Sequence, residues 1–209
     1  MSELSTSSGN GFRGMLKLGV ILALYAAAAC VGLAFVYAGT RERIDINQKA
    51  IMEEALNDLF PGADFEPVYN VKIMDSESKV TIDLNKEDPQ DTGVIAARKN
   101  NAVLGLALRT NMGAFGGPIK LLVGVDTDGK ISGIKILEHS ETPGLGANAV
   151  KPAFYSQFAG KPVTDGFEAK KDVDAITAAT ITSRAVAESV KAAGEAAMSW
   201  FSSQAGGSR

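Results

Sequence analysis

The longest apolar stretch of the chain lies near its start. Residues 18–38 contain no charged side chain, and at about 1.5 Å per residue a helix of this length crosses the roughly 30 Å hydrocarbon core of a bilayer. Basic residues flank both ends of the stretch, namely Arg13, Lys17, Arg41 and Arg43. The pattern predicts a transmembrane helix over residues 15–40. A disordered tail at residues 1–14 and one domain over residues 41–209 complete the expected organisation.

Two other interpretations of the apolar stretch are weaker. It is too long for the apolar region of a cleaved signal peptide, and no convincing cleavage site follows it. Cys30 follows a run of four alanines, and the residues from Ala27 to Cys30 faintly resemble a lipoprotein signal, but the apolar run continues well past Cys30. Small residues such as Ala28 and Gly32 suit close packing against other membrane helices, although a simple alanine-rich anchor remains an equal alternative.

Beyond the span, the hydrophobic period changes from helical to alternating. Apolar residues recur at helical spacing over residues 44–59, and Pro61 and Gly62 end this helix. Strands are predicted at residues 68–73, 80–84, 94–98, 103–109, 119–125 and 131–137. Asn100 and Asn101 predict one turn, and the segment from Asp126 to Lys130 predicts a hairpin.

The last third of the chain returns to helical patterns. Residues 147–158 favour a short helix or loop, residues 161–174 are polar, and a long helix is expected from Arg184 to about residue 202. Consecutive strands with helices before and after them indicate an α+β fold with a mostly antiparallel sheet. They do not indicate a doubly wound one.

Composition limits the chemistry. The 209 residues carry a net charge of −3, which gives no electrostatic basis for binding nucleic acid. A single Cys excludes disulfides within the chain. With only one His in addition, the chain cannot build a thiolate-ligated zinc or iron–sulfur site, and no metal site is predicted. A redox role would therefore require an organic cofactor.

The segment from Asp174 to Thr180 is the most informative one for function. Small and hydroxyl side chains follow one another there, continue through Thr182 and Ser183, and lead directly into the predicted helix. A helix N-terminus presents unpaired N–H groups and the positive end of the helix dipole. The segment therefore predicts a phosphate site.

A second block follows the predicted hairpin. Pro143, Gly144 and Gly146 lie close together, which forces a specific loop and lets another group approach the backbone. Composition alone favours a structural loop here. His139, the only His, is expected to be a satisfied polar residue at a strand end or to hydrogen-bond near a cofactor, and Lys151 is expected to be a surface lysine.

Other motifs are poor candidates. The residues from Gly144 to Ala149 fit G-x-G-x-x-A, but the preceding strands predict a hairpin instead of a βαβ unit. No G-x-S-x-G accompanies His139, so a hydrolase triad is disfavoured. The S-x-x-K match from Ser76 to Lys79 lacks its companion motifs. Asp126 and Asp128 lack the further ligand spacing of a calcium loop.

Three blocks in order resemble the FMN-binding domain family: residues 116–131, 139–146 and 174–180. The last block resembles that family's flavinylation motif, in which a transferase joins FMN through its phosphate to the final Thr or Ser, here Thr180. Ala178 stands where the family usually has Gly, so a positive φ there would strain it. The resemblance implies that Thr180 carries the cofactor and that the remaining candidates hold it: Glu141, Thr142, Pro143, Gly144, Leu145, Gly146, Asp174, Thr177, Ala178, Ala179, Thr182 and Ser183.

The single span and short length resemble the RnfG family, which belongs to the Rnf complex, the ion-translocating ferredoxin:NAD⁺ oxidoreductase. This resemblance implies an electron carrier without a catalytic acid, base or nucleophile of its own. It further implies RnfA, RnfB, RnfC, RnfD and RnfE and a flavin transferase as partners, with the domain on the extracytoplasmic side of a bacterial inner membrane. The related NqrC family, from the sodium-pumping NADH:quinone oxidoreductase, and a membrane-anchored flavin sensor remain alternatives.

Overall fold

The computed structural model describes residues 8–68, 81–82 and 93–206, and it divides into two compact units, Met1–Ala50 and Ile51–Arg209. Helix α1, Ser8–Leu59, forms the described part of the first unit and contributes its last turns to the second. The expected span and the expected helix over residues 44–59 are thus one continuous helix. Residues 8–14, expected in the tail, belong to it too.

Helix α1 is the one helix among the described residues that is long and apolar enough to cross a membrane. The candidate span, Arg13–Leu59, reaches a mean hydropathy of 2.4, and none of its most apolar window is buried. Large apolar side chains such as Leu22 and Phe35 are more than 70% exposed. Because water solvates such a surface poorly, this segment requires an apolar environment.

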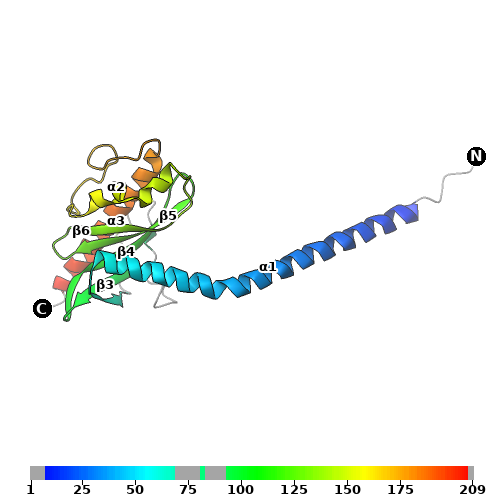
Figure 1. Ribbon diagram of the computed structural model, residues 1–209, viewed down its shortest axis with the longest axis horizontal. Helices are drawn as coiled ribbons and strands as arrows, with labels where there is room; N and C mark the ends of the chain where they lie inside the picture. Colours follow the sequence, from blue (N-terminus) through cyan, green and yellow to red (C-terminus); the bar gives the residue numbers. More distant parts are fainter. Residues whose placement is uncertain (1–7, 69–80, 83–92, 207–209) are drawn as a thin grey trace, which may run out of the picture. The chain divides into compact units, whose positions relative to one another are not determined.

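The second unit is built on one antiparallel sheet (Figure 1). Its main strands follow one another in the order β1-β3-β4-β5-β6, with the short β2 paired to the far end of β4. Their bounds are β1 Asp64–Pro67, β2 Thr81–Ile82, β3 Val94–Lys99, β4 Ala102–Gly113, β5 Pro118–Asp126 and β6 Ile131–His139. The expected α+β class and antiparallel arrangement are confirmed.

The strand predictions differ in outcome. The last four strands are confirmed, with β4 four residues longer than expected at its end. The first was placed too late, since β1 ends at Pro67 and Val68 lies outside it, while residues 69–73 lie outside the described part. Of the strand expected at residues 80–84, only β2 is described. Both predicted turns are confirmed, and Asn100 and Asn101 each have a positive φ, as a tight hairpin requires.

The sheet is covered on both faces. On one face the last turns of α1 bury Ala55, Leu56 and Leu59 against strand residues including Ala97, Ala107 and Leu122. On the other face lies helix α3, Thr180–Gly206, with its apolar stripe on the larger core of the domain. Two covered faces explain the nearly continuous burial of β4 and β5, because alternation is expected only where one face meets water.

Short helical segments connect β6 to α3. They are η1 Gly146–Val150, α2 Pro152–Tyr155 and η2 Ser156–Phe158, as expected for residues 147–158.

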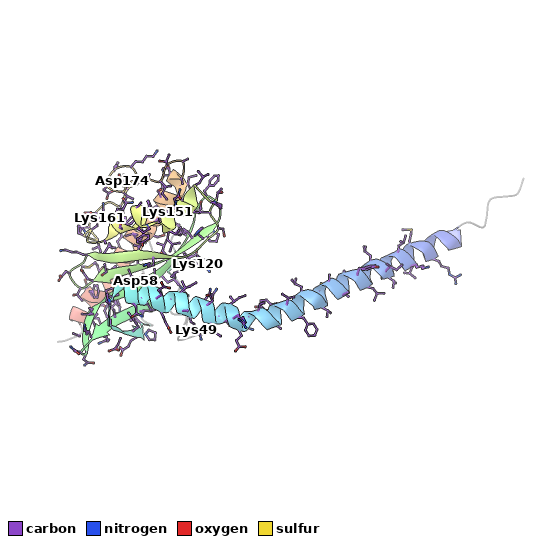
Figure 2. The ribbon with its side chains drawn as sticks, viewed as in Figure 1. Lys49, Asp58, Lys120, Lys151, Lys161 and Asp174 are labelled. Atoms are coloured by element: carbon purple, nitrogen blue, oxygen red, sulfur yellow. The ribbon has the colours of Figure 1, made fainter. Side chains whose placement is uncertain are left out.

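Lys135 of β6 forms an ion pair with Asp58 of α1, and the hydrogen bond between these side chains raises the pKa of Lys135. Figure 2 shows Asp58 on α1 and Lys151 on the side of the sheet that carries α2.

Helix α3 begins four residues earlier than predicted, at Thr180 instead of Arg184. The sequence suggests a later start because Thr and Ser are weak helix formers. In the structure the Ser183 hydroxyl donates to the carbonyl of Ala179 at 3.0 Å and accepts the Ile176 N–H at 2.9 Å. These local bonds hold the first turn in place and bring Thr180 into the helix.

Candidate functional site

The loop that carries Asp174 to Thr180 is anchored from a distant helical turn. Gln157 of η2 accepts the N–H of Asp174 at 2.7 Å and donates to the Asp174 carbonyl at 3.2 Å. The oxygen and the nitrogen of the Gln157 amide therefore both bind the backbone of Asp174, whose side chain stays exposed. Sequence reasoning missed Gln157 because nothing in its neighbourhood marks a contact seventeen residues away.

Thr180 is the first residue of α3, so its hydroxyl lies at the helix N-terminus. The first helical hydrogen bond of this turn runs from the Ser183 N–H to the Ala179 carbonyl, at 3.0 Å. In the described part of the chain, the N–H groups of Thr180, Ile181 and Thr182 have no hydrogen-bond acceptor. Ala179, at the N-cap position, has no side-chain oxygen to serve them. This helix start therefore lacks the acceptor that an anion would supply.

The backbone just before Thr180 is left-handed at Ala178, where φ is +60°. An L-residue with a Cβ adopts this region at a cost of about 1–2 kcal/mol, whereas glycine adopts it freely. The strain expected at this position is thus present. Ala178 lies at the end of the loop, two residues before α3 begins at Thr180.

Glu141 joins three separate segments of the chain. Its side chain is buried, with 7% exposure. One carboxylate oxygen accepts the N–H of Gly116, from the turn between β4 and β5, at 2.9 Å. The other accepts the hydroxyl of Thr182, in the first turn of α3, at 3.0 Å. We call this arrangement the Glu141 junction. It brings together the three blocks that sequence analysis singled out.

Three exposed, large apolar residues are sequence neighbours of the residues at the Glu141 junction. Phe115, Leu145 and Ile181 are 72%, 41% and 54% exposed. Each of them directly precedes a residue that approaches the Glu141 carboxyl group, namely Gly116, Gly146 and Thr182. Consecutive Cα atoms are about 3.8 Å apart, so these three side chains emerge from one small region. Exposed apolar residues and an uncapped helix start in the same region can accommodate a ligand with an aromatic part and an anionic part.

The remaining candidates occupy different positions around the junction. Thr142, Pro143, Gly144 and Thr177 are exposed, and Gly144 has a φ of +81°. His139 accepts the N–H of Glu141 on Nδ1 at 3.3 Å, which places it beneath the loop. Thr182 and Ser183 are fully buried, and their hydroxyls bond to other parts of the chain. Lys151 is exposed, and Figure 2 labels it together with Asp174 in the part of the domain around α2.

The polar segment before the site is ordered by one carboxylate. Asp172 accepts the N–H of Phe167 at 2.7 Å and that of Glu168 at 2.5 Å. Partial burial by itself would raise the pKa of Asp172, but these backbone hydrogen bonds, with the charge of Lys161, outweigh it and lower the pKa below its usual range. Among the residues that the structure describes, no group of three or more His, Cys, Asp or Glu side chains is arranged to hold a metal ion.

Two families match this chain. The FMN-binding domain family matches residues 114–195, which include all three segments of the Glu141 junction. The RnfG N-terminal region family matches residues 4–59. The fold and the matched segments define a membrane-anchored protein with an FMN-binding domain.

Relatives with known names cover nearly the whole chain. The G subunit of the ion-translocating oxidoreductase complex of Methanosarcina acetivorans is 33% identical over 85% of this chain and 91% of its own length. The G subunit of the Na⁺-translocating ferredoxin:NAD⁺ oxidoreductase complex of Acetobacterium woodii is 33% identical over 84% of this chain and 88% of its own. The chain belongs to the RnfG family, the G subunits of ion-translocating oxidoreductase complexes. A crystal structure of NqrC from Shewanella oneidensis is 23% identical, with a TM-score of 0.46 over 54% of this chain and 60% of that one.

Proposed function

We propose that this chain is an electron-carrier subunit of a membrane-bound, ion-translocating ferredoxin:NAD⁺ oxidoreductase, and that its FMN is attached through the phosphate to the Thr180 hydroxyl. Membership of the RnfG family and the match to the FMN-binding domain support the carrier role. The NqrC alternative is less favoured, because the relatives that cover this chain are named as G subunits. The partners are then the other Rnf subunits and a flavin transferase.

One observation carries the attachment at Thr180. Its hydroxyl lies at a helix start whose first three N–H groups lack an acceptor among the described residues and whose N-cap residue, Ala179, has no polar side chain. A phosphate on this hydroxyl would meet those N–H groups and the positive end of the helix dipole. The exposed apolar cluster of Phe115, Leu145 and Ile181 would contact the ring system.

A covalent link has a physical reason where free cofactor is scarce. A site with a dissociation constant of about 1 μM that meets about 1 nM of ligand is filled only about 0.1% of the time, by mass action. When bound, the flavin supplies the electron-transfer chemistry. The chain's own residues would bind and orient it: the first turn of α3 would hold the phosphate, and the loop from Thr142 to Gly146 would contact the ring. No side chain of the protein is required to transfer a proton.

Replacing the acceptor tests the proposal. In Thr180→Ala, made in the full chain together with a flavin transferase, we expect a folded, membrane-inserted and colourless protein. Flavin fluorescence on a denaturing gel measures attachment, and Thr164→Ala, which removes an exposed threonine hydroxyl outside the candidate site, is the control. A fluorescent Thr180→Ala band, or loss of fluorescence in the control alone, would contradict attachment at this residue.

The location of the domain is also part of the proposal. We place unit Ile51–Arg209 on the extracytoplasmic side of a bacterial cytoplasmic membrane, with α1 as the single span. Scarcity of free FMN on that side is the condition under which attachment matters most. Ser203 is exposed on α3, so a membrane-impermeant thiol reagent should label Ser203→Cys in intact spheroplasts. Labelling only after lysis would place the domain on the other side.

A further inference from the structure

The buried side chain of Glu141 accepts hydrogen bonds but has no positively charged partner among the described residues. It receives hydrogen bonds from Gly116 and Thr182, and it forms no ion pair with any residue in the described part of the chain. Moving a carboxylate out of water is costly, and unpaired buried charges are uncommon for that reason. An apolar side chain here would leave the Gly116 N–H and the buried Thr182 hydroxyl without this acceptor, so the carboxylate is the group that links these two segments.

The surrounding backbone is shaped to admit this carboxylate. A Cβ on Gly146 would lie 2.0 Å from Glu141 Oε2 and 2.7 Å from Thr182 Oγ1, so glycine at this position leaves room for the hydrogen bond. The φ of Gly146 is not positive, and thus space, not backbone conformation, requires glycine. A Cβ on Gly116 would likewise lie 2.4 Å from the Ser140 carbonyl oxygen and 2.9 Å from the Glu141 Cα. Two glycines thus permit three segments to meet at one side chain.

The contact to Thr182 controls where Thr180 lies. The two residues share the first turn of α3, and a displacement of Thr182 displaces the hydroxyl of Thr180 with it. Glu141 itself immediately precedes the loop from Thr142 to Gly146. One side chain therefore sets the position of the attachment turn relative to that loop and to the turn at Gly116.

We propose that Glu141 is a positioning residue that holds the Thr180 turn in register with the loop from Thr142 to Gly146, so that both ends of the attached flavin are placed at once. This inference rests on the proposed attachment of FMN to Thr180. The ribityl chain between the phosphate and the ring is flexible but of limited reach, so the ring keeps one position only if the two protein segments keep their separation. Glu141 fixes that separation through hydrogen bonds, and not through its charge.

The experiment compares variants of the full chain, each produced together with a flavin transferase. In Glu141→Ala and in Thr182→Val, which removes only the hydroxyl from this contact, we expect Thr180 to remain loaded. The fluorescence anisotropy of the attached flavin should fall, and its reduction potential should shift. In Glu141→Gln the amide can accept from Gly116 and donate to Thr182. We therefore expect the anisotropy and the potential to be restored.

Controls separate positioning from general destabilisation. Val190→Ala removes buried volume from the middle of α3, away from the Glu141 junction, and should lower stability without changing the anisotropy. Equal anisotropy in wild type, Glu141→Ala and Thr182→Val would overturn the inference. So would a Val190→Ala variant that loses as much anisotropy as they do, or a Glu141→Gln variant that fails to rescue. If wild-type Thr180 itself carries no flavin, the proposed function fails instead.

Discussion

Two carboxylates hold loops at the ends of this sheet, and they differ in where their donors come from. Asp126, in the turn between β5 and β6, accepts the N–H groups of Asp128 at 3.0 Å and Lys130 at 2.8 Å, two and four residues along the chain. Glu141 accepts from Gly116 and Thr182, which are 25 and 41 residues away. The first closes a single turn. Glu141 joins its own loop to the turn at Gly116 and to the first turn of α3.

The difference shows how one fold separates stability from function. A turn closed by its own residues depends mainly on the local sequence and holds no distant segment in place. A junction between distant segments exists only in the folded domain, and it transmits any change to every segment it holds. The exposed apolar residues Phe115, Leu145 and Ile181 are sequence neighbours of the Glu141 junction, whereas the turn from Asp126 to Lys130 contains no apolar side chain.

Gly146→Ala should lower the free energy of unfolding more than any other substitution considered, because its added Cβ disrupts the Glu141 junction directly. The added Cβ would lie 2.0 Å from Glu141 Oε2, so the carboxylate must leave Thr182 or the loop must move. We expect a loss of about 2–4 kcal/mol in the free energy of unfolding, from a lost charged hydrogen bond and from overpacking. Urea denaturation measures it.

Gly144→Ala is the matched control for that change. A Cβ there meets nothing within 4 Å, and the only strain comes from a φ of +81°. It should cost about 1 kcal/mol. Equal losses for the two alanine variants would show that the carboxylate contact at Gly146 contributes nothing beyond backbone strain.

Asp126→Ala removes the carboxylate that closes the turn between β5 and β6. It should lower the free energy of unfolding by less than Gly146→Ala. It removes the acceptor of two backbone N–H groups in a turn where water can replace it, so we expect a loss of about 1 kcal/mol. The anisotropy of an attached flavin should not change. Asp128→Ala, which removes the neighbouring exposed carboxylate of the same turn, is the control. A change in flavin anisotropy on loss of Asp126 would mean that the two ends of the sheet are coupled.

Ala178→Gly should change the free energy of unfolding least, and it should raise that free energy instead of lowering it. Glycine relieves the strain of φ +60°, but it also increases the entropy of the unfolded chain, so we expect a net gain between zero and about 1 kcal/mol. Ala175→Gly, in the same loop but without a positive φ, should instead lose about 0.5–1 kcal/mol. A clear destabilisation by Ala178→Gly would show that the left-handed backbone does not strain this loop.

Local signals in the sequence predict much of this protein. The apolar, β-branched runs at residues 119–125 and 131–137, separated by Asp126 to Lys130, predict the hairpin of β5 and β6, because strand propensity and turn chemistry act over a few residues. The apolar run of residues 18–38 predicts the helix in the same way. The boundary errors arise where local propensity is overruled, as at the start of α3, where the side-chain bonds of Ser183 favour an earlier turn.

For the candidate site, the sequence shows which residues are available: a threonine shortly before the predicted helix, small residues before it, and a glycine-rich loop elsewhere. The contacts of Glu141 with Gly116 and Thr182, and of Gln157 with Asp174, exist only in the folded domain. The physical reason is that these contacts join segments 17 to 41 residues apart. Their formation depends on how the sheet places those segments, and no local pattern of side chains encodes that placement.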